Sequence, residues 1–130
     1  MKITAFFALL LVSVSVFAAD DISIPEPSQN PGAVFRLYRT QNIHTLLKLD
    51  TRTGQVWQVQ LGDEGQRFQT AINRLSLVEH TAALKPGRFT LYPTPNIFTF
   101  VLVDQDDGRI WQLQWGKDTD RFVIAVPKPD

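Results

Sequence analysis

The 130-residue chain contains no cysteine. Its absence excludes disulfides, thiolate nucleophiles, cysteine-bound zinc and iron–sulfur clusters. An excess of charge of either sign is also missing, because 13 Lys and Arg residues balance 13 Asp and Glu residues. The chain therefore lacks the basic surplus on which nucleic-acid binding depends, and we expect no nucleic-acid partner. The length is that of one ordinary domain.

Long hydrophobic runs are confined to the first 19 residues. Lys2 precedes an apolar stretch over residues 3–17, and the small residues Ala18 and Ala19 follow it. This order predicts a cleaved secretory signal peptide at residues 1–19. The stretch is shorter than the ~20 residues that a spanning helix needs, so we expect no stable membrane insertion after cleavage. Together with the lack of cysteines and of Asn-x-Ser/Thr sequons, it predicts a bacterial periplasmic or secreted protein.

The rest of the chain contains one pattern twice, at a constant offset of 54 residues. Residues 35–73 align with residues 89–127 without a gap, and 16 of the 39 aligned pairs are identical. The shared motifs are Phe-x-Leu-Tyr-x-Thr-x-Asn-Ile-x-Thr and Asp-x-x-x-Gly-x-x-Trp-Gln-x-Gln-x-Gly. We predict a duplicated unit within one compact domain over residues 32–127. After the signal peptide, the predicted segments of the chain are an extended N-terminal segment (20–34), the first repeat (35–73), a connector (74–88) and the second repeat (89–127).

Each copy predicts an antiparallel meander of three to four strands. Short runs of β-branched and aromatic residues flank two hairpin loops, at residues 50–54 and 104–108, in which the final Gly can adopt positive φ. One such sheet leaves an apolar face uncovered. We therefore predict an all-β fold in which two meanders pack about a pseudo-twofold axis, as a small sandwich or flattened barrel.

The alternation of side chains predicts which face of each strand is buried. Trp57 and Trp111 alternate with glutamines, so the tryptophan side is expected to face the core in both copies. The apolar residues common to both copies are core candidates: Phe35/Phe89, Leu37/Leu91, Ile43/Ile97, Trp57/Trp111 and Phe68/Phe122. The shared arginines, Arg67 and Arg121, are either partners of Asp50 and Asp104 or solvated side chains.

Residues 49–57, Leu-Asp-Thr-Arg-Thr-Gly-Gln-Val-Trp, resemble the strand–turn–strand of β-propeller blades, notably those related to quinoprotein dehydrogenases. Two blades are too few to close a propeller, which typically has at least ~4. Over residues 32–127 the chain is similar to a group of small exported bacterial proteins that carry this module, usually twice. This resemblance implies a β-sheet module and no particular activity.

Catalytic and metal-binding patterns are not apparent in the sequence. His44, one of only two histidines, corresponds to Phe98 in the second copy. The acidic turn before Gly108 lacks the downstream Glu of a calcium loop. No Ser lies in a Gly-x-Ser-x-Gly elbow, and Asp50 and Asp104 each begin a turn. We therefore expect no metal, no cofactor and no catalytic residues, with an enzyme of atypical site as an alternative.

Two sets of residues are candidates for binding. The first is a ladder of glutamines that bond either across strands or to a ligand: Gln58, Gln60, Gln112 and Gln114. The second is an apolar group in the second copy: Phe98, Phe100, Leu102 and Trp115. In the first copy these positions are His44, Leu46, Lys48 and Leu61, so the apolar face is present in one half only.

Such an apolar face has to be covered. Either the connector covers it, through Leu75, Leu77, Val78 and Leu84, or a partner protein, a second subunit or a ligand does. We expect a non-catalytic binding module of the bacterial envelope, whose partner is a protein, a peptide or a glycan. A homodimer is also compatible with these surfaces. The alternative is a small-ligand carrier with its site between the two sheets.

Overall fold

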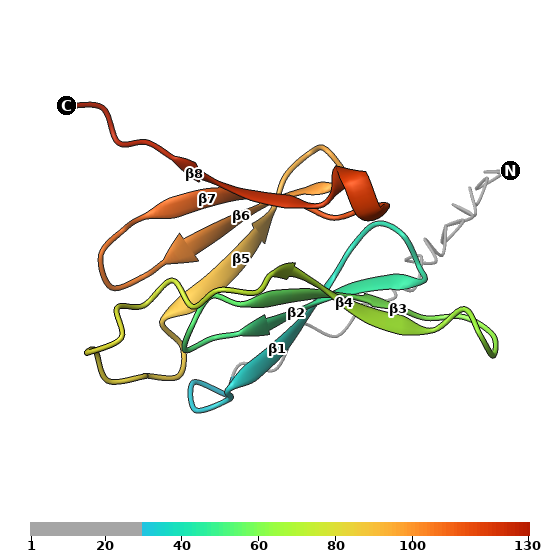
Figure 1. Ribbon diagram of the computed structural model, residues 1–130, viewed down its shortest axis with the longest axis horizontal. Coiled ribbons are helices and arrows are strands. Elements are labelled where there is room, and N and C mark those ends of the chain that lie inside the picture. The colour runs from blue at the N-terminus through green and yellow to red at the C-terminus, as the bar shows by residue number, and fades with distance from the viewer. Residues whose placement is uncertain (1–29) are drawn as a thin grey trace, which may run out of the picture.

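The computed structural model describes residues 30–130, so the predicted signal peptide and most of the predicted N-terminal segment lie outside the described residues. The described chain forms two four-stranded antiparallel sheets, which Figure 1 shows as two packed layers. Neither sheet closes into a barrel. The predicted all-β sandwich of two meanders is confirmed.

Both sheets follow the order of the chain. Sheet 1 consists of β1 (Phe35–Arg39), β2 (Thr45–Asp50), β3 (Val56–Gln60) and β4 (Phe68–Asn73). Sheet 2 consists of β5 (Phe89–Pro93), β6 (Thr99–Asp104), β7 (Ile110–Gln114) and β8 (Phe122–Val126). One turn of 3-10 helix, η1 (Asp118–Asp120), precedes β8. Within residues 30–130 no helix is long and apolar enough to cross a membrane.

The offset of 54 residues also relates the strand pairings. Phe35 pairs with Asp50 in sheet 1, and Phe89 pairs with Asp104 in sheet 2. The hairpin turns agree as well, because Gly54 and Gly108 both have φ of 79°. Each turn is closed by the carboxylate of the aspartate that precedes it, which accepts a hydrogen bond from the backbone amide two residues later. The prediction of two matching hairpins is confirmed.

The two sheets bury opposite faces. In sheet 2 the tryptophan side faces the core, with Trp111 only 7% exposed and Gln112 exposed. In sheet 1 the glutamine side faces the core, with Gln58 only 3% exposed and Trp57 half-buried. The prediction for the tryptophan side is therefore correct for the second copy and wrong for the first. A twofold axis would bury the same face of both sheets, whereas here equivalent faces point in the same direction.

Lys48 explains the choice of face in sheet 1. It occupies the position of Leu102, which is fully buried in sheet 2. Burying an unpaired ammonium group between the sheets is costly. Sheet 1 instead turns Leu47 and Leu49, on the other face of β2, into the core.

The core between the sheets is continuous. Its buried members are Leu47, Leu49, Val56, Val78, Phe89, Leu91, Phe100, Leu102, Trp111, Leu113 and Trp115. Five core candidates lie elsewhere because of the choice of face or their place in a loop: Phe35, Leu37, Ile43, Ile97 and Phe68 are exposed. Phe122 is half-buried.

The connector contributes two residues to this core and forms no helix over residues 74–88. Val78 is buried, and Leu77 packs against the cluster. Leu75 and Leu84 are exposed. Three of the four apolar residues of the second copy, Phe100, Leu102 and Trp115, are therefore core, whereas Phe98 is exposed. Sheet 1, with part of the connector, completes this core.

Candidate binding site between the sheets

An open groove of about 450 Å³ lies where the end of sheet 1 meets the loop between β7 and β8. Its lining combines aromatic, amide and charged side chains: Asn42, Thr45, Gln58, Gln60, Phe68, Phe98, Trp115, Gly116, Lys117, Asp120 and Arg121. The two sheets supply opposite walls, so their packing creates the groove.

Three aromatic rings form the apolar part of the groove. The rings of Phe98 and Trp115 lie 4.8 Å apart between centroids. The Trp115 indole donates a hydrogen bond of 2.8 Å to the carbonyl of Ile97, which fixes its orientation. Trp115 is buried, whereas Phe98 and Phe68 are exposed. A molecule in the groove would therefore contact mainly the two phenylalanine rings.

Gln58 joins the two sheets at the floor of the groove. Its side-chain oxygen accepts hydrogen bonds from the Gly116 amide at 3.0 Å and from Arg121 Nε at 3.1 Å. Arg121 also forms an ion pair with Asp118 at 2.8 Å. The suggested pairing of Arg121 with Asp104 is therefore wrong, because the loop before β8 holds the guanidinium beside Gln58 instead.

Lys117 and Asp120 bring opposite charges to the rim. Both residues are exposed, and within residues 30–130 neither side chain has a hydrogen-bond or ion-pair partner. Beside the aromatic rings, the ammonium group can donate hydrogen bonds to a polar ligand and the carboxylate can accept hydrogen bonds from it. The rim therefore offers both hydrogen-bond donors and acceptors to a bound molecule.

The structure brings four of the eight predicted binding residues into this groove: Gln58, Gln60, Phe98 and Trp115. Phe100 and Leu102 lie in the core, where no partner reaches them. Gln112 is exposed on the outer face of sheet 2. Gln114 donates a hydrogen bond of 3.0 Å to the backbone carbonyl of Asp120 and thereby supports the loop.

Lys117 and Asp120 are not among the residues predicted to bind. Their counterparts in the first copy, Asp63 and Gln66, differ in chemical type. The loop also has no alternation that would reveal which side chains point toward the groove. The difference in charge between Lys117 and Asp63 was the one available signal.

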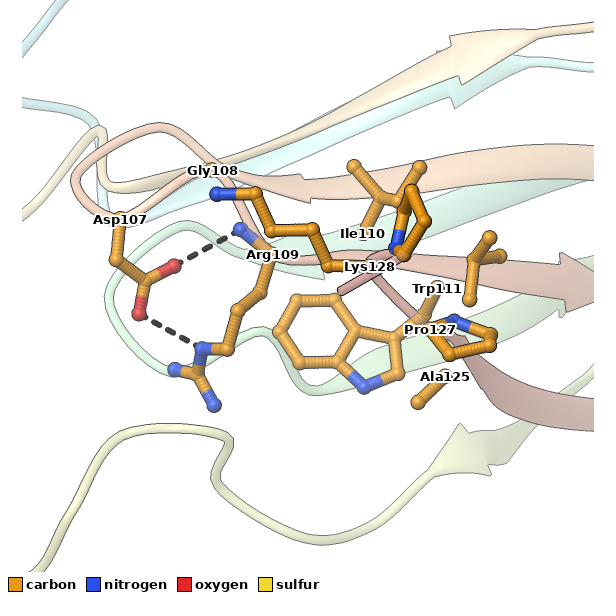
Figure 2. A pocket seen from close by; sticks show the side chains of 10 residues that line it. Asp107, Gly108, Arg109, Ile110, Trp111, Ala125, Pro127 and Lys128 are labelled. Atoms are coloured by element: carbon orange, nitrogen blue, oxygen red, sulfur yellow. Dashed lines mark hydrogen bonds and ion pairs between the residues drawn. The ribbon is translucent and has the colours of Figure 1, made fainter.

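A second recess, of about 560 Å³, lies at the other end of sheet 2 between the β6–β7 turn and the chain that follows β8. Figure 2 shows Arg109 alongside the Trp111 indole and hydrogen-bonded to Asp107. The guanidinium also bonds to Asp104 at 3.1 Å. Because Arg109 is engaged by these carboxylates and most of the remaining lining is apolar, the recess suits an apolar side chain better than a charged ligand.

Asp104 is the centre of a buried ionic cluster beside this recess. Its carboxylate forms ion pairs with Arg88 at 2.8 Å and Arg109 at 3.1 Å. Burial favours the protonated form, but hydrogen bonds from Arg88, the Asp106 amide and Arg109 outweigh it and lower the pKa of Asp104 to about 2. Within residues 30–130 no cluster of three His, Asp or Glu side chains is arranged to hold a metal ion.

Comparisons with protein-family models, with curated proteins and with solved structures give no match to this chain.

Proposed function

We propose that the protein is an exported, non-catalytic binding module that takes a saccharide unit of an envelope glycan in the groove between its sheets. The supporting observation is the composition of the groove, in which two exposed phenylalanine rings lie beside an unpaired Lys117 and Asp120. A sugar ring has an apolar face that packs on aromatic rings and hydroxyl groups that bond to amides and charged groups. The proposal that the protein is exported rests on the signal-like sequence at residues 1–19.

The size of the groove favours a small ligand or one unit of a chain. Its volume of about 450 Å³ lies within the range of roughly 300–1,000 Å³ that is typical of small-molecule sites. The groove is open to solvent at the edge of the sandwich, so a longer glycan could pass through it. A carrier that encloses its cargo between the sheets is less favoured, because side chains such as Leu47, Leu102 and Phe89 fill that space.

Glycan-array screening of the mature chain, followed by isothermal titration of the best saccharide, tests this proposal. Phe98→Ala and Asp120→Asn should each weaken binding about tenfold or more, since each removes one contact worth roughly 1.4 kcal/mol. Ile43→Ala is the matched control, because Ile43 is highly exposed and lies outside the groove. Its affinity should equal that of the wild type.

Absence of saccharide binding by the folded protein would refute the proposal. Binding by the Phe98→Ala and Asp120→Asn variants with the affinity of the wild type would also refute it, because the saccharide would then bind elsewhere.

A further inference from the structure

The two outer faces of the sandwich carry the same residue pattern as the two faces that pack together inside it. The outer face of sheet 1 presents Phe35, Leu37 and Trp57, which are identical to the core residues Phe89, Leu91 and Trp111. The outer face of sheet 2 presents Thr99, Val101, Val103, Ile110 and Gln112, which correspond to core-facing Thr45, Leu47, Leu49, Val56 and Gln58. Each outer face therefore resembles one half of an interface that the chain already forms.

Both outer faces leave large apolar side chains in solvent. Phe35 and Leu37 are each 51% exposed on sheet 1, and Ile124 is 59% exposed on sheet 2. Large apolar side chains exposed on a sheet face are typical of a protein interface.

The polar contact that joins the sheets can also be repeated between copies. Inside the chain Gln58 accepts from the Gly116 amide and from Arg121. The residues at the offset of 54 are Gln112, Gly62 and Arg67, and all three are identical to their counterparts. Gln112 is exposed on the outer face of sheet 2, so this contact requires a neighbouring chain to supply Gly62 and Arg67.

Gly54 and Gly108 occupy equivalent positions in the hairpin turns of the two sheets, and their surroundings differ. Inside the chain Phe89 packs so closely on Gly54 that an added Cβ would lie 3.0 Å from its ring. At the equivalent Gly108 an added Cβ meets nothing within 4 Å, and this glycine lines the recess. The counterpart of Phe89 is Phe35, which is half exposed. By this correspondence, Phe35 of a second copy would pack on Gly108, where the structure leaves room.

We propose that copies of this chain associate head to tail, with the outer face of sheet 1 on the outer face of sheet 2 of the next copy, and close into a ring. Head-to-tail interfaces give rings when the rotation between copies closes. Known rings of four-stranded sheets contain about 4–8 sheets. The ring therefore contains two, three or four chains. The assembly uses different surfaces from the ligand groove and does not depend on it.

Lys48 makes this contact weaker than the one inside the chain. Lys48 and Gln69 occupy the positions of Leu102 and Val123, and the two side chains are hydrogen-bonded to each other. The ammonium group lies 4.9 Å from the centre of the Trp57 ring, which favours a cation in a partly dry site. We therefore expect a reversible assembly that tightens when the pair is replaced by the residues of the second copy.

Native mass spectrometry and light scattering of the mature chain test the proposal. The wild type should show one discrete species of two, three or four copies. Phe35→Asp and Ile124→Asp each place a carboxylate on one outer face at an exposed position, so both variants should fold and remain monomeric. Ile43→Asp, in the loop before β2, is the matched control and should assemble like the wild type.

Mixing the two monomeric variants tests whether copies associate through two different outer faces or through the same face. Each retains one intact face, so an equimolar mixture should give a dimer containing one chain of each kind. Lys48→Leu/Gln69→Val should lower the dissociation constant at least tenfold without changing the number of copies.

A wild type that stays monomeric at all concentrations would overturn the proposal. A dimer formed by Ile124→Asp alone would also overturn it, because two copies would then be joined by the same face. Normal assembly of Phe98→Ala without saccharide binding would support the ring and separate it from the ligand groove.

Discussion

Replacing Asp104 by Asn should destabilise the fold strongly at neutral pH. The side chain of Asp104 is fully buried and forms ion pairs with Arg88 and Arg109. The pKa of this carboxyl falls from 3.8 to about 2 in the folded protein. Each unit corresponds to about 1.4 kcal/mol, so ionised Asp104 contributes about 2 kcal/mol. Asp104→Asn also leaves Arg88 with only its longer ion pairs to Asp106 at 3.8 Å and Asp107 at 3.7 Å, and we expect a total loss of about 3 kcal/mol.

The sign of the pH dependence follows from the lowered pKa. The unfolded chain binds the proton more readily, so the contribution of Asp104 is complete above pH 3.8 and is lost as pH falls through about 2. Urea denaturation followed by tryptophan fluorescence at several pH values measures this effect. The difference in free energy of unfolding between the wild type and Asp104→Asn should decrease as pH falls from 4 to about 2. A loss of unfolding free energy below about 1 kcal/mol at pH 7 would refute the reasoning. A difference between the two proteins that stays constant with pH would also refute it.

Two further predictions concern packing. Gly54→Ala should destabilise the fold by about 1–3 kcal/mol more than Gly108→Ala, because the new methyl group would lie 2.8 Å from Leu77 at the first position and open space surrounds the second; urea denaturation at low protein concentration compares them, and equal losses would contradict the packing described. Leu49→Ala should cost about 2–5 kcal/mol, while Ile43→Ala should change stability by less than about 0.5 kcal/mol, since the first side chain is buried and the second is exposed; thermal and urea unfolding measure both, and a large loss for Ile43→Ala would count against the assigned exposure.

The strand order and turns could be predicted from the sequence because their signals are local. Asp50 and Gly54, like Asp104 and Gly108, begin and end a hairpin within five residues. The gap-free offset then implies that both copies pair their strands in the same register. These features need no knowledge of how the sheets pack.

The buried face of sheet 1 could not be predicted from alternation alone. Both faces of β2 carry leucines, at Leu46 and at Leu47 and Leu49, so the period of two fits either choice. Lys48 was the informative residue, but we expected the same face of both copies to be buried. The sheets instead pack head to tail, and this long-range arrangement decides which residues form the core.

Only part of the groove could be predicted from the sequence. Phe98 and Trp115 stand out because they differ from His44 and Leu61 in the first copy. Lys117 and Asp120 lie in a loop whose direction depends on the contacts of Gln114 and Arg121. No local pattern determines where such a loop lies.

Nuclear Overhauser measurements on a mixture of isotope-labelled and unlabelled chains test the head-to-tail packing most directly. Within one chain, the α-protons of Gly54 should show contacts with the Phe89 ring, which lies 3.0 Å from an added Cβ. Between chains, the α-protons of Gly108 should show contacts with the Phe35 ring. A chain in which Gly54 contacts no aromatic ring, or in which Phe35 contacts the core of its own chain, would contradict the account.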